Sequence, residues 1–189
     1  APKTGNPMSE HVSPDYTPFY CEENIYRLLL SPHLQDRENY AVFISNPARC
    51  CPLWSQRAAP NPGDPVFWDY HVVMASFRPG KPCELWDLDN THGYPLAVKQ
   101  WWAYTFPMID ALRPEFLPWF RVIEQEDFIV NFSSDRSHMI DSQGHYVEPP
   151  PPWERPGEGN SNLQDYIDMT PETGPGKVLD ARAFLMAMR

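Results

Sequence analysis

Proline restricts this chain more than any other residue type. It occupies 23 of the 189 positions, well over twice the usual share of about 5%. Because proline cannot donate a backbone hydrogen bond and fixes its own φ angle, helices and strands end where prolines cluster. Aromatic residues make up 14% of the chain, which argues against disorder. We therefore expect a globular protein whose short helices and strands are joined by long, stiff connections.

The length of the chain fits one domain. At 189 residues it can bury a hydrophobic core of its own, and the sequence contains no internal repeat. Residues 1–19 are polar and proline-rich, so we expect an extended N-terminal arm that is ordered only where it lies on the body. Residues 20–189 are then expected to form a single domain.

The charge of the chain argues against several classes of partner. A formal charge of −10 and the lack of any lysine or arginine run disfavour a surface for nucleic acid or for anionic lipid. No apolar run approaches the ~18 residues that span a bilayer, and the first residues lack the apolar core of a signal peptide. We expect a soluble cytoplasmic protein, with the nucleus left open as a second location.

The cysteines point to an intracellular, metal-free protein. Cys21, Cys50, Cys51 and Cys83 form no C-x-x-C pair. Their spacing fits neither a zinc site nor the disulfide framework of a secreted domain. We expect reduced thiols, no metal and no cofactor.

Cys21 lies where a proline-rich segment is predicted to become a helix. Pro18 keeps the preceding chain extended, and after Cys21 the apolar residues repeat at the spacing of one helix face. The predicted helix runs from about Cys21 to Leu30. In its first turn, the unpaired N–H groups and the positive end of the helix dipole favour a thiolate, the nucleophilic form of cysteine. Without partners elsewhere, Cys21 would be interpreted as a small buried hydrophobic residue.

Two predicted strands bring a histidine and an acid together. Residues 66–77 form the strongest strand pattern, and residues 83–89 follow after a turn centred on Pro79. In an antiparallel hairpin the numbers of opposed residues have a constant sum, here about 158, which places His71 opposite Asp87 on one face of the sheet. A register shift of two residues would still leave the two side chains diagonal neighbours.

Cys21, His71 and Asp87 together provide the groups that thiol chemistry needs. The imidazole takes the thiol proton and later protonates the leaving group, while the carboxylate fixes the tautomer of the imidazole. The chain order Cys, His, Asp, with the nucleophile at the start of a helix and its partners on neighbouring strands, is found in papain-like and transglutaminase-like thiol enzymes. Taken singly, His71 could be a core histidine bonded to a carbonyl, and Asp87 could pair with a lysine or with strand-end amides.

Six blocks of sequence, in this order, also resemble the protein N-terminal glutamine amidohydrolase family. They are YCEEN at 20–24, AVFISN at 41–46, WDYHVV at 68–73, DLD at 87–89, SDRSHM at 134–139 and EPPPP at 148–152. The resemblance runs from about Tyr20 to the C-terminal helix. It places the catalytic cysteine, histidine and aspartate of the family on Cys21, His71 and Asp87.

The resemblance implies a monomeric α/β (α+β) enzyme of papain-like or transglutaminase-like build, with an antiparallel sheet and a helix that carries the nucleophile. Such an enzyme converts the N-terminal glutamine of proteins and peptides to glutamate, releases ammonia, and feeds the arginylation branch of the N-degron pathway. It needs neither a metal nor a nucleotide. Selecting a terminal glutamine requires an acceptor for its α-ammonium group, and Glu22 and Asp135 are the candidate substrate-binding residues.

Other functions stay open at this stage. A thiol peptidase or a transglutaminase would use the same three residues on a peptide bond or on an amine acceptor. A binding module for protein N-termini or proline-rich segments would carry out no chemistry, and its cysteine would be incidental. Ammonia release without chain cleavage or cross-linking would separate the amidohydrolase from all of these.

The rest of the pattern predicts short elements. We expect strands at 40–45 and 121–123, a strand beginning near Cys50, helical segments at 107–112 and 161–168, and a last helix, Ala181 to Met188, capped by Asp180. Residues 127–132 fit a helix or a strand equally well. The proline run at 149–152 is expected to adopt polyproline II and to pack on its own domain rather than to serve as an SH3 ligand.

Overall fold

A six-stranded antiparallel sheet forms the centre of the computed structural model, which describes residues 12–189. Residues 1–11 of the predicted arm lie outside the described residues. The strand order is β6-β5-β4-β1-β7-β8. The strands are β1 (Glu38–Ser45), β4 (His71–Phe77), β5 (Glu84–Trp86), β6 (Leu96–Ala97), β7 (Trp119–Glu124) and β8 (Lys177–Asp180). A separate small sheet pairs β2 (Cys51–Leu53) with β3 (Val66–Trp68).

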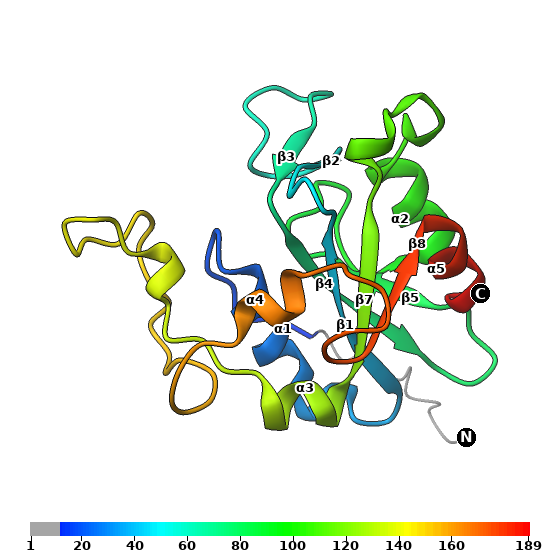
Figure 1. Cartoon of the computed structure of the whole chain (residues 1–189). Coiled ribbons are helices and arrows are strands. Elements are labelled where there is room, and N and C mark those ends of the chain that lie inside the picture. Colours follow the sequence, from blue (N-terminus) through cyan, green and yellow to red (C-terminus); the bar gives the residue numbers. More distant parts are fainter. Residues whose placement is uncertain (1–11) are drawn as a thin grey trace, which may run out of the picture.

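Helices cover both faces of the central sheet (Figure 1). One face carries α1 (Cys21–Leu29), α3 (Gln125–Asn131) and α4 (Leu163–Ile167), and the other carries α2 (Val98–Thr105) and α5 (Ala181–Ala187). The connections contain the 3-10 turns η1 (Pro32–Leu34), η2 (Ile109–Ala111), η3 (Pro114–Phe116) and η4 (Ser137–Met139). Among residues 12–189, no helix has the length and apolar character needed to cross a bilayer.

Side-chain alternation along the central strands divides the core into two layers. Phe43 of β1 and Met74 of β4 pack in the cluster beneath α1, α3 and α4. Their neighbours Ile44 and Ala75 belong to the cluster beneath α2 and α5. Because both faces of the sheet are buried, these strands appear in the sequence as nearly continuous apolar runs.

Most of the predicted short elements are confirmed. Helices α1, α4 and α5 lie within the segments that the sequence indicated, and β2 begins near Cys50. Strands β1 and β7 include the predicted segments 40–45 and 121–123 and extend beyond them. Asp180 caps α5 as expected, because its carboxylate accepts the Ala183 N–H at 2.8 Å. Residues 125–131 form helix α3. The helical segment expected at 107–112 is only the turn η2, and α2 is a helix that the pattern did not predict.

The prediction of one continuous strand at 66–77 is wrong. The chain bends at Asp69 and Tyr70, so that β3 pairs with β2 and only β4 joins the central sheet. The Ser45 hydroxyl donates to the Asp69 carbonyl at 2.7 Å, and the Asp69 carboxylate accepts the Tyr70 N–H at 2.9 Å. These two bonds hold the bend and make His71 the first residue of β4.

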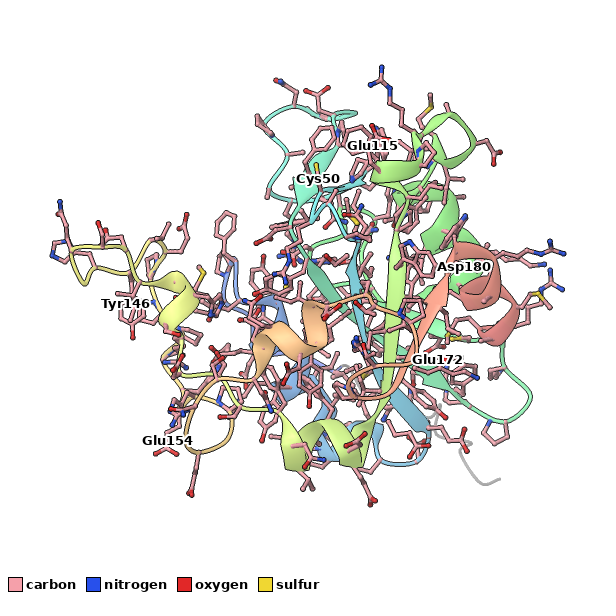
Figure 2. The ribbon with its side chains drawn as sticks, viewed as in Figure 1. Cys50, Glu115, Tyr146, Glu154, Glu172 and Asp180 are labelled. Carbon is pink, nitrogen blue, oxygen red and sulfur yellow. The ribbon has the colours of Figure 1, made fainter. Side chains whose placement is uncertain are left out.

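The segment after α3 projects from the body and then returns to it. Tyr146 lies in the projecting part (Figure 2). The returning chain is held on the domain by the Tyr20 hydroxyl, which donates to the Glu148 carbonyl at 3.0 Å. Pro151 is buried. The predicted packing of the proline run is thus seen at Pro151, while Pro149, Pro150 and Pro152 are exposed.

Candidate active site

Cys21 begins α1, in the position that the sequence predicted. The first helical hydrogen bonds are donated by the amides of Glu23 and Asn24 to the Tyr20 carbonyl, at 3.1 and 2.9 Å. The amides of Cys21 and Glu22 precede these bonds and are therefore available to a ligand at the helix start. The Asn24 side chain fixes the entry to the helix by binding both the N–H and the carbonyl of Thr17, at 2.8 and 2.9 Å.

His71 and Asp87 form a buried hydrogen-bonded pair. His71 Nε2 lies 2.8 Å from Asp87 Oδ1, and each side chain is only 1% exposed. The indole of Trp68 stacks on the imidazole, with ring centroids 5.3 Å apart and planes 12° apart. Because Nε2 is bound to Asp87, Nδ1 is the nitrogen that remains for proton exchange with a substrate.

Asp87 is held by four donors. Besides His71, its carboxylate accepts the Gln56 side-chain amide at 3.1 Å, the Trp101 indole N–H at 3.2 Å and the Asp89 backbone N–H at 3.2 Å. Burial alone would raise the pKa of Asp87, but the charge of His71 and these hydrogen bonds outweigh it, and the pKa lies below its usual value. Asp87 is therefore an anion that fixes the orientation of the imidazole.

The predicted hairpin register is wrong by two residues. Strands β4 and β5 pair Met74 with Trp86 and Ala75 with Leu85, so that opposed numbers sum to 160. β5 ends at Trp86, and Asp87 lies just beyond it. A shift of two keeps each side chain on its face of the sheet, so Asp87 still reaches His71 diagonally.

The sulfur of Cys21 lies against the start of β4. The backbone N–H of Val72, the residue after His71, is directed at the sulfur and favours the thiolate. Burial nevertheless raises the pKa of Cys21 well above its ordinary value, and the charges of Glu22 and Asp89 raise it further. Burial and these charges therefore oppose the helix start and the Val72 N–H, which favour the thiolate.

Glu22 is a buried acid beside Cys21. Its Oε2 lies 3.7 Å from Cys21 Sγ and accepts the Tyr70 hydroxyl at 2.9 Å. Its Oε1 lies 3.3 Å from His138 Nε2 and has no hydrogen-bond partner of good geometry among residues 12–189. The side chain is fully buried. A buried carboxylate with an open oxygen can bind a cationic or hydrogen-bond-donating ligand group.

Asp135, the second candidate for substrate binding, lies on the surface three residues before His138. Its carboxylate is exposed and accepts the Ser137 N–H at 2.9 Å at the start of η4. The neighbouring Arg136 instead reaches the first turn of α1, where it binds the buried Glu23 at 2.8 and 2.9 Å. This ion pair positions the segment that carries His138 over the start of α1.

Asp89 is a further acid at the site. Its Oδ2 lies 3.9 Å from His71 Nδ1, and its Oδ1 accepts the Tyr16 hydroxyl at 2.5 Å. His71, Asp87 and Asp89 offer possible metal-ligand atoms within 4.8 Å of one another. His71 Nε2 and one oxygen of Asp87 are already bound to each other. This pairing suits proton transfer.

The sequence patterns missed several residues of the site. Gln56 and Trp101 come from segments without any local motif, so nothing short of the fold could reveal them. Trp68, Tyr70 and His138 stand within the blocks 68–73 and 134–139 that carry the family resemblance. Their place in those blocks is the signal that could have identified them.

A family model and individual relatives both match this chain to proteins that act on N-terminal glutamine. Residues 16–188 match the family model described as N-terminal glutamine amidase. The protein N-terminal glutamine amidohydrolase of Homo sapiens is 41% identical over 175 residues, covering 89% of this chain and 85% of the human protein. Proteins of the same name from Bos taurus and Drosophila melanogaster are 40% and 37% identical, each over 90% of this chain and over 84% and 86% of their own lengths.

Proposed function

Since the chain belongs to the N-terminal glutamine amidase family, we propose that it deamidates N-terminal glutamine through a catalytic triad of Cys21, His71 and Asp87. The chain is a hydrolase that acts on amide bonds. The observation that carries the triad is the buried 2.8 Å bond between His71 and Asp87 at the point where the cysteine-bearing helix meets β4. This arrangement also supports a papain-like or transglutaminase-like build.

His71 acts as the base of the first step. Its Nδ1 takes the proton of Cys21, and the thiolate attacks the δ-carbon of the glutamine side chain. The Cys21 amide at the start of α1 binds the oxyanion, a contribution typically worth a factor of about 10²–10³. His71 then passes its proton to the amide nitrogen, the C–N bond breaks, and ammonia leaves a thioester on the sulfur. Water that His71 deprotonates hydrolyses the thioester to glutamate.

Glu22 binds the α-ammonium group of the substrate. A fully extended glutamine side chain places its α-nitrogen about 5 Å from its δ-carbon, as four single bonds of about 1.5 Å require. The Glu22 carboxylate lies 3.7 Å from the attacking sulfur, so it can contact that nitrogen while the sulfur contacts the δ-carbon. Its buried Oε1 lies 3.3 Å from His138 Nε2 but has no hydrogen-bond partner of good geometry among residues 12–189, so it can accept such a donor.

The proposal also covers the pathway and the cellular location in which the enzyme acts. The glutamate that the enzyme makes would feed the arginylation branch of the N-degron pathway. The enzyme would act there as a cytoplasmic monomer, in the nucleus as well, on proteins and peptides that begin with glutamine. These roles rest on the family to which the chain belongs.

A peptide panel tests the function. Four peptides are incubated with the protein, and mass spectrometry follows their conversion to the acid. Three begin with glutamine, acetylated glutamine or asparagine, and the fourth carries glutamine only at an internal position. Asparagine is one methylene shorter, which costs about 1–3 kcal/mol in binding, and it holds its amide farther from the sulfur. Acetylation removes the partner of a buried charge, and sites built for polar groups reject such errors by roughly 10⁴. Conversion of internal glutamine at a comparable rate would contradict the proposal and favour a transglutaminase.

Two matched substitutions test the α-ammonium site. Glu22→Gln should lower kcat/KM for the glutamine peptide at least about 30-fold, because breaking a buried charge pair costs about 2–5 kcal/mol. It should also lower the ratio of kcat/KM for the free glutamine peptide to kcat/KM for the acetylated one. Asp135→Asn removes the same charge from an exposed turn and should change kcat/KM little. A larger loss in Asp135→Asn than in Glu22→Gln would transfer the role to Asp135.

A further inference from the structure

Asp89 is a buried acid at the reacting centre that the mechanism above does not use. His71 donates or accepts at Nδ1 during the reaction, because Asp87 occupies Nε2. Asp89 Oδ2 lies 3.9 Å from this Nδ1, and its charge acts on the Cys21 thiol. The carboxylate therefore borders the space in which the leaving group must accept its proton.

The surroundings of Asp89 fix one of its oxygens and leave the other available. Oδ1 accepts the Tyr16 hydroxyl at 2.5 Å, and the Arg57 guanidinium lies 4.9 Å above the Tyr16 ring. Burial raises the pKa of Asp89, while His71, Tyr16 and Arg57 oppose that rise. Oδ2 accepts no hydrogen bond from the residues that the structure describes, and the side chain is 9% exposed.

We propose that Asp89 Oδ2 binds the NH₂ group of the substrate carboxamide and directs it toward His71 Nδ1. An amide nitrogen that receives a proton from Nδ1 must lie about 3 Å from it. Since Oδ2 is 3.9 Å from Nδ1, one position can be within hydrogen-bond distance of both atoms. The amide has two N–H donors, so it can donate one to Asp89 while its nitrogen accepts the proton of the imidazolium.

This contact would also distinguish substrate from product. A carboxamide offers N–H donors to Asp89, whereas the glutamate product presents a second carboxylate and is repelled. The inference rests on the proposed deamidation and adds to it the residue that orients the amide and favours product release. Tyr16 becomes a positioning residue, because it holds Asp89 in place.

A comparison of amide and ester substrates tests the role of Asp89. One peptide begins with glutamine, and its twin begins with glutamate γ-methyl ester, which has no N–H to donate. Asp89→Ala should lower kcat/KM for the amide about 10- to 100-fold more than for the ester, the range expected when a hydrogen bond to a charged group is lost. Inhibition by the glutamate peptide should strengthen. Tyr16→Phe should also lower the ratio of kcat/KM for the amide to kcat/KM for the ester, but by a smaller factor than Asp89→Ala.

The variants and outcomes separate this inference from the function on which it rests. Asp89→Leu keeps the approximate size of the side chain but has no hydrogen-bond acceptor, and it serves if Asp89→Ala fails to fold. Equal losses on amide and ester in these variants would show a merely structural role and overturn the inference alone. A wild-type protein inactive on both peptides would overturn the proposed deamidation together with it.

Discussion

His71 is enclosed by Trp68 on one ring face and by Asp87 at Nε2. Burial by itself lowers the pKa of His71, but the charge and hydrogen bond of Asp87, followed by the charges of Asp89 and Glu22, raise it above its ordinary value. The imidazolium that forms during the reaction is thus stabilised. Because the neutral imidazole is the base, kcat/KM should rise with pH as His71 loses its proton, at a pH above the ordinary histidine value of about 6.5.

Asp87→Asn should lower kcat/KM by about 10⁴, by analogy with the tautomer effect in serine enzymes. It should also move the acidic limb of the pH profile to lower pH, because the protonated imidazole loses its anionic partner while its burial remains. A pH profile of kcat/KM checks both effects.

The control for this change is Asp64→Asn, which removes the same charge from an exposed loop and should leave the profile unchanged. If Asp87→Asn were mild and Asp89→Asn had the large effect instead, Asp89 would be the true partner of the histidine.

At this scale the sequence predicted the contact between His71 and Asp87 but not the residues that support it. Side-chain alternation placed His71 and Asp87 on one face, and that prediction survived a register error of two residues because the period of a strand is two. Gln56 and Trp101, which hold Asp87, come from β2–β3 and α2 regions with no pattern that signals a site. Only the assembled fold brings them to the carboxylate.

Among the elements, the helix that carries Cys21 could be predicted because a proline and an apolar repeat mark its start. The bend between β3 and β4 could not be predicted, since the apolar run from 66 to 77 is continuous and the bend depends on Ser45, a residue of another strand. α2 was missed for a related reason. Its aromatic residues lack a clear helical period in sequence, and packing on the sheet decides their conformation.

Gly176, just before β8, tests how tightly the sheet edge is packed. Its φ is +62°, and a Cβ there would lie 2.2 Å from the Val122 carbonyl oxygen and 2.8 Å from the Ile123 side chain. Gly176→Ala should destabilise the fold by about 3 kcal/mol, from left-handed strain of about 1–2 kcal/mol plus the clash. Thermal unfolding should show a Tm lower by about 6–12 °C.

Gly159 provides the matched control. Its φ is +83°, but nothing lies within 4 Å of an added Cβ. Gly159→Ala should therefore cost only the strain, about 1–2 kcal/mol. Equal Tm losses in the two variants would contradict the close approach of Gly176 to β7.

On the scale of the whole molecule, the site is assembled from segments that are far apart in the sequence. Residues 16–22 supply Tyr16 and Cys21, and residues 68–71 and 87–89 supply His71, Asp87 and Asp89. Residues 136–138 lie against Glu22. Glu23, which directly follows the first segment, binds Arg136 of the last segment and also the Trp153 indole. Sequence patterns could identify the three catalytic candidates, but the residues that surround them are brought together by these long-range contacts.

The most direct test of the central claim is mass spectrometry of a peptide that begins with glutamine, after incubation with wild-type protein, Cys21→Ala, Cys21→Ser and Cys50→Ala. Cys50 is a partly exposed free thiol and serves as the matched control (Figure 2). Wild-type protein and Cys50→Ala should convert the peptide to its glutamate form. Both Cys21 variants should be folded but inactive, because alanine is no nucleophile and serine has too high a pKa to replace the thiol. Substantial conversion by Cys21→Ala would contradict the assignment of the catalytic site.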